Sequence, residues 1–263
     1  MAVDVVVVNY RTDDLLQDFI ASYQESKFEG CKLYVIDVGV GDDIENYPHW
    51  AHQLVSIPSS GAFSRFRENV GYAKACNAGA ALGTNDVILL ANADTLLSTG
   101  LQECHDALMR HAEWGVLGPR QTNDQGLIVA GGIFGTETSI GLRGWNELDR
   151  GQYNDIRDDA KSVSGSLYFI KRDLWEELTN CDFYQQAAPG ATGAFLPTFH
   201  YWEETFCSYH SRAHGYKCVY YGPVQMTHHW HRASPVGGPV DQHAEESKAY
   251  YRSACQMHGI VHE

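Results

Sequence analysis

Short apolar runs alternate with amphipathic stretches along the first half of the chain. Residues 3–8 are all valine apart from Asp4, and residues 33–36 and 87–90 form similar runs. Such runs are typical of strands that are buried on both faces of a parallel sheet. A weaker run at residues 53–57 predicts a further strand, the third in chain order.

Helical patterns separate these strands. Thr12 supplies an N-cap, and two aspartates follow it in the first turn of a helix that ends near residue 27. Residues 72–82 and 97–111 predict two more helices. Strands that alternate with helices imply a parallel sheet with right-handed crossovers, so the first half has the organisation of a Rossmann-like nucleotide-binding unit.

The pattern changes after Pro119. The turn sequence Asn-Asp-Gln-Gly at residues 123–126, followed by an apolar run, predicts a β-hairpin. Residues 136–161 are rich in Gly, Asp and Arg and predict an irregular loop. We therefore place a boundary near residue 120, between residues 1–120 and 121–263, as two halves of one domain.

Composition restricts the class of protein. The chain has 263 residues, a net charge of −14 and no apolar run near the roughly 20 residues that a membrane-spanning helix needs. We expect a cytoplasmic protein without a transmembrane segment. The negative charge disfavours non-specific binding to nucleic acid. The seven cysteines are scattered without a C-x-x-C pair, which favours neither a disulfide framework nor a zinc ribbon.

The most informative segment joins a glycine turn, a helix of small residues and an apolar strand. Asp94 comes just past the end of that strand, where open α/β sheets bind ligands. A divalent cation such as Mn²⁺ or Mg²⁺ prefers oxygen ligands from one or two carboxylates and from substrate phosphates, so Asp94 is a candidate ligand. The segment carries Asn69, Gly71, Tyr72, Ala73, Asn77, Gly79, Asn92, Ala93 and Asp94.

These residues resemble the family 2 glycosyltransferases of the GT-A type, especially their rhamnosyltransferase-like branch, which carries N-x-G-[FY]-A-x-x-x-N-x-G, a hydrophobic strand, and then N-P-D or D-x-D. The resemblance implies an α/β GT-A fold with a mixed, mostly parallel sheet. It implies a nucleotide-sugar-binding half at residues 1–120 and an acceptor-binding, catalytic half at residues 121–263. The implied activity is an inverting, hexosyltransferase-type transfer from a UDP-, dTDP- or GDP-linked sugar to a hydroxyl of a glycan or other acceptor.

The resemblance also implies which residues bind the donor. Asp37 corresponds to the family aspartate that hydrogen-bonds the base, although a carboxylate at a strand end can simply cap a turn. Asn92 replaces the first acid of D-x-D, and either Asn92 or Asp94 could instead cap the following helix. Gly165 lies in a block similar to a family strand and either admits substrate or packs against a neighbour. The implied donor-binding residues are Asn9, Tyr10, Arg11, Asp37, Asn69, Gly71, Tyr72, Asn77, Asn92, Ala93, Asp94 and Gly165.

The catalytic carboxylate is expected at the start of a helix that Gly215 ends. In the family pattern the catalytic aspartate corresponds to Glu204, and Glu203 is the alternative general base. Adjacent acids in a first helical turn can also act only on the helix dipole. The neighbouring Trp202 is expected to contact the acceptor.

A histidine that completes the metal site is expected after a strand ending at Tyr221. His228 and His229 both qualify, because strand parity is lost at the Gly-Pro pair that follows Tyr221. Residues 185–200, rich in Ala, Gly, Pro and Phe, predict a mobile acceptor loop that closes when the donor binds.

Two other classes of function remain open. A non-catalytic nucleotide- or carbohydrate-binding module could keep the same fold with the altered D-x-D and the Glu-Glu pair. A Rossmann oxidoreductase is disfavoured because no G-x-G-x-x-G follows the first strand.

Overall fold

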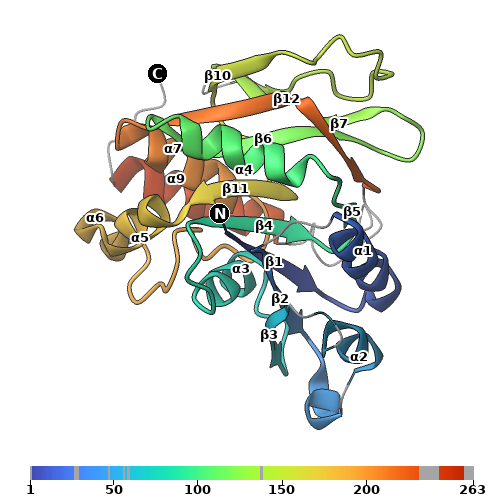
Figure 1. Cartoon of the computed structure of the whole chain (residues 1–263). Coiled ribbons are helices and arrows are strands. Elements are labelled where there is room, and N and C mark those ends of the chain that lie inside the picture. The colour runs from blue at the N-terminus through green and yellow to red at the C-terminus, as the bar shows by residue number, and fades with distance from the viewer. Residues whose placement is uncertain are drawn as a thin grey trace.

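The computed structural model describes residues 2–26, 30–46, 48–55, 57, 60–136, 139–230 and 243–257. Within these residues one large sheet has the strand order β10-β12-β6-β11-β4-β1-β2-β3, from the top to the bottom of Figure 1, with β5 paired to β12 and β7 to β6. Its strands are β1 (Val3–Asn9), β2 (Lys32–Val38), β3 (Ser60–Phe66), β4 (Val87–Asn92), β5 (Thr95–Leu96), β6 (Trp114–Thr122), β7 (Ile128–Ala130), β10 (Ile156–Ala160), β11 (Leu167–Lys171) and β12 (Lys217–His228). A separate hairpin pairs β8 (Ile133–Thr136) with β9 (Ser139–Leu142).

The long strands mostly point the same way. β1 is parallel to β2 and β4, and β2 is parallel to β3. β11 is antiparallel to both β4 and β6, so β6 has the direction of β4, and β12 is parallel to β6. The α/β class and the mixed, mostly parallel sheet expected from the sequence are thereby confirmed.

Helices cover both faces of the sheet, and the alternation of side chains along β1 shows how. Val3, Val5 and Val7 join one buried cluster with side chains of α1, α2 and α4, whereas Val6 and Val8 join another with side chains of α3, α5 and α7. The helices are α1 (Asp13–Ser26), the 3-10 helix η1 (Gly41–Glu45), α2 (His49–Val55), α3 (Tyr72–Ala80), α4 (Leu101–Arg110), α5 (Arg172–Asn180), α6 (Asp182–Ala187), α7 (Glu203–Ala213) and α9 (Ala244–Met257). No helix among the described residues has the length and apolar character needed to cross a membrane.

The connections create a crevice between β1 and β4. From β1 the chain continues to β2 and β3 on one side, and β4 then returns to pair with the other side of β1. Open α/β sheets bind ligands at such a switch point, beyond the carboxyl ends of the strands. The fold therefore directs attention to the residues that follow β1 and β4.

A buried ion pair joins the two halves of the chain. Arg172, the first residue of α5, donates from Nη2 to Oδ2 of Asp4 in β1 at 2.8 Å. The same oxygen accepts the backbone N–H of Asn85 at 2.8 Å, and Asp4 is fully buried. Since a buried carboxylate without its partner is strongly destabilising, this pair couples residues 1–120 to the second half.

The structure corrects several expected elements. Residues 53–55 belong to α2, because Trp50, Ala51 and Leu54 recur at helical spacing and are buried. The third strand is instead β3, an edge strand whose polar sequence hides it. The helix expected from residue 97 begins at Leu101, because Thr95 and Leu96 pair with β12.

The second half contains more strand than its sequence suggested. Residues 136–161, expected to be irregular, include β9 and the mostly exposed edge strand β10. The hairpin expected around residues 123–126 is present as β6 and β7. β12 does not end at Tyr221 but continues to His228, with a register shift between Tyr221 and Gln225.

Candidate functional site

A first cavity, of about 60 Å³, lies beyond the carboxyl ends of β1 and β4. It occupies the crevice that the strand order creates. Six of the residues expected to bind the donor line it, and two residues from a distant segment close it. The six are Tyr10, Asn69, Gly71, Tyr72, Asn92 and Ala93, and the two are Phe199 and His200.

The turn before α3 is built against the segment that contains Phe199. Gly71 has a φ of 84°, and a Cβ there would lie 2.4 Å from the carbonyl oxygen of Phe199. The same oxygen accepts the backbone N–H of Tyr72 at 2.8 Å, while Oδ1 of Asn69 accepts the N–H of Gly71 at 3.0 Å. Both the conformation and the close approach require glycine. The Asn-x-Gly-Tyr motif thus shapes one wall of the cavity.

A second cavity, of about 190 Å³, shares Tyr72, Asn92 and His200 with the first. The hydroxyl of Tyr72 donates to the carbonyl oxygen of Gly165 at 2.8 Å, which fixes the chain before β11 at the boundary of the two cavities. A Cβ on Gly165 would lie 3.3 Å from Cβ of Glu204. The remaining side of the second cavity is formed by Ser164, Ser166, Glu203, Glu204, His228 and Trp230, among others.

A third and larger cavity, of about 460 Å³, adjoins the second at the start of α7. Glu204 lines both of them, whereas Glu203 lines only the second. Tyr201 and Trp202 also line the third cavity, together with the apolar side chains of Ile133 and Leu142. Glu204 is therefore a carboxylate placed between two spaces, one of which is apolar and aromatic.

The two adjacent glutamates have different surroundings. Glu203 is 3% exposed and accepts a hydrogen bond from the Thr198 hydroxyl at 3.0 Å. Burial, reinforced by the neighbouring charge of Glu204, raises the pKa of Glu203 well above its ordinary value. Burial also raises the pKa of Glu204, which is half-buried at the cavity wall. Of the pair, Glu204 is the group placed to accept a proton from a bound molecule.

Backbone strain gathers around these cavities. Tyr201 and Trp202 have φ values of 68° and 72°, and Trp230 has 49°. Arg11 lies between Tyr10 and Thr12, which line the first cavity, and has a φ of 55°. Non-glycine residues rarely adopt this region, and such outliers cluster at functional sites. The two consecutive left-handed residues before α7 set the direction in which Glu204 enters the site.

Asp94 and His228 meet beside the second cavity because β5 pairs with β12. The register places Thr95 opposite His228, and Asp94 Oδ1 lies 3.3 Å from His228 Nε2. Both residues are buried, at 2% and 4% exposed. A carboxylate and an imidazole suit Mn²⁺, and Mg²⁺ would use the carboxylate, with phosphates and water as the other ligands. The donor set thus fits the expected cation.

His229 lies differently. Its backbone N–H donates to the carbonyl oxygen of Asp94 at 2.8 Å, but its Nδ1 is 2.6 Å from Oδ1 of Asp124 on the β6–β7 turn. The side chain of His229 is therefore directed to Asp124 rather than to the Asp94 carboxylate. Of the two histidines that the sequence left open, His228 is the one beside Asp94.

Three residues expected to bind the donor make hydrogen bonds within the protein. The Asn9 amide donates to Asp13 at 2.8 Å and to Asp37 at 2.9 Å, and Asp37 also accepts Nε of Arg65 at 3.0 Å. The Asn77 amide bonds the backbone of Phe195 through both its nitrogen and its oxygen. Asn9, Asp37 and Asn77 do not line the described cavities, and neither does Asp94. Arg11 is also outside the lining, with its guanidinium over the Tyr10 ring.

Residues 188–200 form an irregular connection without helix or strand, as the composition of residues 185–200 suggested, but the segment is packed into the protein. Residues 185–187 end α6, and Phe195 and Leu196 are fully buried. The Phe195 ring packs against those of Tyr168 and Trp175, at centroid distances of 5.3 and 5.5 Å. The middle of the segment is thus part of the core, and its end at Phe199 and His200 lines the site. The aromatic sequence at residues 199–202 was the available signal for this contribution.

Together, the strand order, the crevice and the carboxylate after β4 define an α/β protein with the GT-A fold, the fold of many glycosyltransferases. No protein-family profile matches the sequence, and no curated protein sequence matches it. Solved structures with this fold do match. One is the mannosyltransferase PcManGT from Pyrobaculum calidifontis in complex with GDP-Man and Mn²⁺, with a TM-score of 0.61 and 15% identity over 95% of this chain and 64% of that one.

Two further structures have the same fold. S. aureus TarS 1–349 matches with a TM-score of 0.61 and 10% identity, over 97% of this chain and 72% of that one. GalNAc-T7 with UDP, GalNAc and Mn²⁺ matches with a TM-score of 0.62 and 13% identity, over 97% of this chain and 48% of that one. This chain therefore spans between about half and three quarters of these three chains. At these identities the likeness establishes the GT-A fold, as the sequence motifs predicted, and leaves the rhamnosyltransferase-like branch as a prediction.

Proposed function

We propose that this protein is a metal-dependent glycosyltransferase that moves a sugar from a nucleoside-diphosphate sugar to an acceptor hydroxyl with inversion. The observation that carries the proposal is the position of Glu204, which lines two adjoining cavities close to the Asp94–His228 pair. A transferase needs a donor site and an acceptor site with a proton acceptor between them. The arrangement of cavities around Glu204 supports an assignment of all three.

In this proposal the nucleoside lies in the first cavity, on the wall formed by Tyr10, Asn69 and Gly71. Asp94 and His228 would hold Mn²⁺ or Mg²⁺, which offsets the charge of the leaving diphosphate. The transferred sugar occupies the second cavity, where Gly165 lets it approach the backbone. The structures of PcManGT with GDP-Man and Mn²⁺ and of GalNAc-T7 with UDP and Mn²⁺ support this choice of donor class and cation.

The acceptor enters through the third cavity, where the rings of Tyr201 and Trp202 offer surfaces for a sugar. Glu204 takes the proton of the acceptor hydroxyl while that oxygen forms a bond to the anomeric carbon. The bond from the anomeric carbon to the diphosphate oxygen breaks on the opposite face, and its electron pair leaves with the nucleoside diphosphate. A single displacement of this kind inverts the anomeric centre. In this division of labour, residues 1–120 bind the donor and residues 121–263 bind the acceptor and supply the base.

A donor panel tests the proposal. The protein is incubated with UDP-, dTDP- and GDP-linked sugars and Mn²⁺, and release of nucleoside diphosphate is measured with and without simple sugar acceptors. We expect slow hydrolysis of one donor class, loss of this hydrolysis in Asp94→Asn, and acceleration by an acceptor. Nucleotide binding without any turnover, seen as a Mn²⁺-dependent thermal shift, would instead indicate a non-catalytic binding module.

A further inference from the structure

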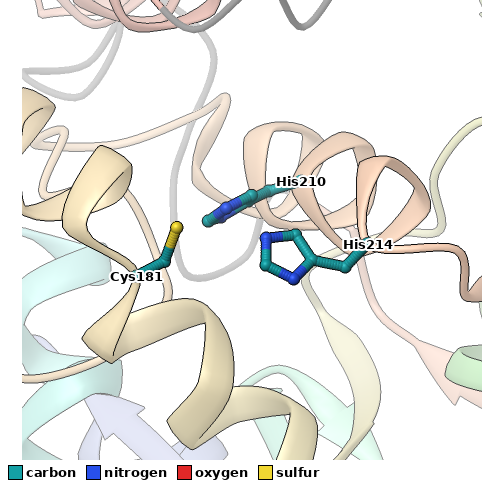
Figure 2. A group of neighbouring side chains, drawn as sticks. All are labelled: Cys181, His210 and His214. Carbon is teal, nitrogen blue, oxygen red and sulfur yellow. The ribbon is translucent and has the colours of Figure 1, made fainter.

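Cys181, His210 and His214 form a cluster outside the three cavities. One ligand atom from each, the sulfur or a ring nitrogen, lies within 4.8 Å of the other two, and Figure 2 shows the three side chains converging. His210 lies six residues beyond Glu204 on α7, which is about 9 Å along the helix axis. The cluster is therefore separate from the proposed base, and it shares no residue with the Asp94–His228 pair.

The fold holds these three side chains from two directions. His210 and His214 are four residues apart at the end of α7, so they occupy the same face of the helix. Cys181 is the single residue between α5 and α6, and it ends one helix and begins the other. The cluster consequently spans the contact between α7 and the α5–α6 junction.

His214 has the support that is usual for a metal ligand. Its Nδ1 lies 2.6 Å from Oε1 of Glu177, on α5. Metal-binding histidines commonly donate one ring N–H to a carboxylate, which fixes the ring and presents the other nitrogen to the metal. Here the bond to Glu177 leaves Nε2 of His214 for the cluster. His210 is 1% exposed and packs against the rings of Phe183 and Phe206.

We propose that Cys181, His210 and His214 bind Zn²⁺, which clips α7 to the α5–α6 junction. One thiolate and two imidazoles are ligands that zinc accepts, whereas Mg²⁺ takes oxygen ligands. Zn–S and Zn–N bonds of about 2.3 and 2.0 Å in a tetrahedron place the ligand atoms about 3.3–3.6 Å apart. Side-chain rotations that move these atoms by about 1 Å close the present spacing around the ion. The fourth position is open to water, and the thiol of Cys181 releases its proton on binding.

Cobalt substitution tests the site directly. The experiment uses the whole chain as Asp94→Asn, which removes the carboxylate of the other proposed metal site. Co²⁺ bound through Cys181 gives a thiolate-to-cobalt charge-transfer band and the visible bands of tetrahedral cobalt, and one equivalent of Zn²⁺ abolishes both. Cys181→Ser removes the charge-transfer band. His214→Asn removes the tetrahedral spectrum, whereas His52→Asn, an exposed histidine on α2, leaves it unchanged.

Two further measurements separate a metal site from ordinary packing. Cys181 is the one cysteine of the seven that is not buried, so thiol alkylation followed by mass spectrometry reports on it selectively. Zn²⁺ should slow its alkylation and raise the thermal midpoint, and Glu177→Gln should weaken Zn²⁺ binding about 10–100-fold. Absence of a thiolate–cobalt band in the parent protein, or a band that survives Cys181→Ser, would overturn the proposal. Failure of glycosyl transfer would leave these readings unaffected.

Discussion

Exchanging each of the two adjacent glutamates for glutamine separates their roles. Glu204→Gln keeps the size and hydrogen bonding of the side chain but removes its ability to accept a proton. Because Glu204 lines the acceptor side of the site and not the first cavity, nucleotide affinity should stay within about twofold. Glu203→Gln should retain most of the activity, since Glu203 is buried and bonded to Thr198.

The expected loss for Glu204→Gln is about 10²–10⁴ in kcat. At about 1.4 kcal/mol for each factor of ten, this is roughly 3–5 kcal/mol of barrier. Burial raises the pKa of Glu204 above the ordinary value of 4.5, which makes it a stronger base and favours the upper part of the range. The base acts when deprotonated, so kcat/KM should fall as the pH decreases through this raised pKa, and that acidic limb should disappear in Glu204→Gln.

The raised pKa of Glu203 affects the stability of the fold rather than catalysis. Its pKa in the folded protein is raised, so the folded state favours the protonated form. The carboxyl therefore stabilises the fold fully below its ordinary, unfolded pKa of 4.5, and this contribution is lost as the pH rises through the folded pKa. Glu203→Gln cannot ionise, so its thermal midpoint relative to the parent protein should increase from pH 5 to pH 8.

The assay measures donor turnover and acceptor transfer for both variants across pH 5–9, with thermal unfolding at each pH. The acidic limb persisting in Glu204→Gln, or a larger loss of kcat in Glu203→Gln than in Glu204→Gln, would contradict the assignment of Glu204 as base. A matched loss of nucleotide binding in Glu204→Gln would show that the substitution disturbs the donor site instead.

Three other substitutions test the remaining parts of the site. Asp94→Asn should abolish turnover and remove the Mn²⁺ dependence of nucleotide binding, measured by calorimetry, because it deletes the proposed carboxylate ligand; unchanged activity would exclude that ligand. Gly71→Ala should cost about 1–3 kcal/mol of unfolding free energy and weaken nucleotide binding, since its φ is 84° and Phe199 blocks the new Cβ; wild-type binding would show that the turn can rearrange. Phe195→Ala should lower the free energy of unfolding by about 3–5 kcal/mol in a denaturant titration, because Phe195 is fully buried. The parent protein should resist proteolysis within residues 185–200 with or without nucleotide. Rapid cleavage there would show that the segment opens.

The central sheet could be predicted from the sequence because its strands are buried on both faces. The valines of β1 and the apolar run of β4 have no other stable environment in a chain of this length. The edge strands β3 and β10 could not be predicted in the same way. They are partly or mostly exposed, so their polar residues carry no alternation that distinguishes a strand from a loop.

The motif after β3 illustrates a second limit. Asn69, Gly71 and Tyr72 line the first cavity, whereas Asn77, five residues further along the same motif, ties α3 to the backbone of Phe195. Both asparagines are polar side chains in a nucleotide-binding segment, and either could bond a ligand or the protein. The difference depends on the packing of residues 193–199 against α3, which comes from more than 100 residues away in sequence and leaves no local signal.

The metal pair shows how a small irregularity decides the chemistry. Neighbouring residues of a strand point to opposite faces, so a shift of one residue would exchange His228 for His229. The register of β12 against β6 shifts between Tyr221 and Gln225, at the Gly-Pro pair, and no alternation can be carried across that point. What fixes the outcome is the pairing of Thr95 with His228, because it sets the imidazole beside the carboxylate that follows β4. The sequence therefore specifies the two candidate ligands, but only the strand pairing of residues far apart in the chain selects between them.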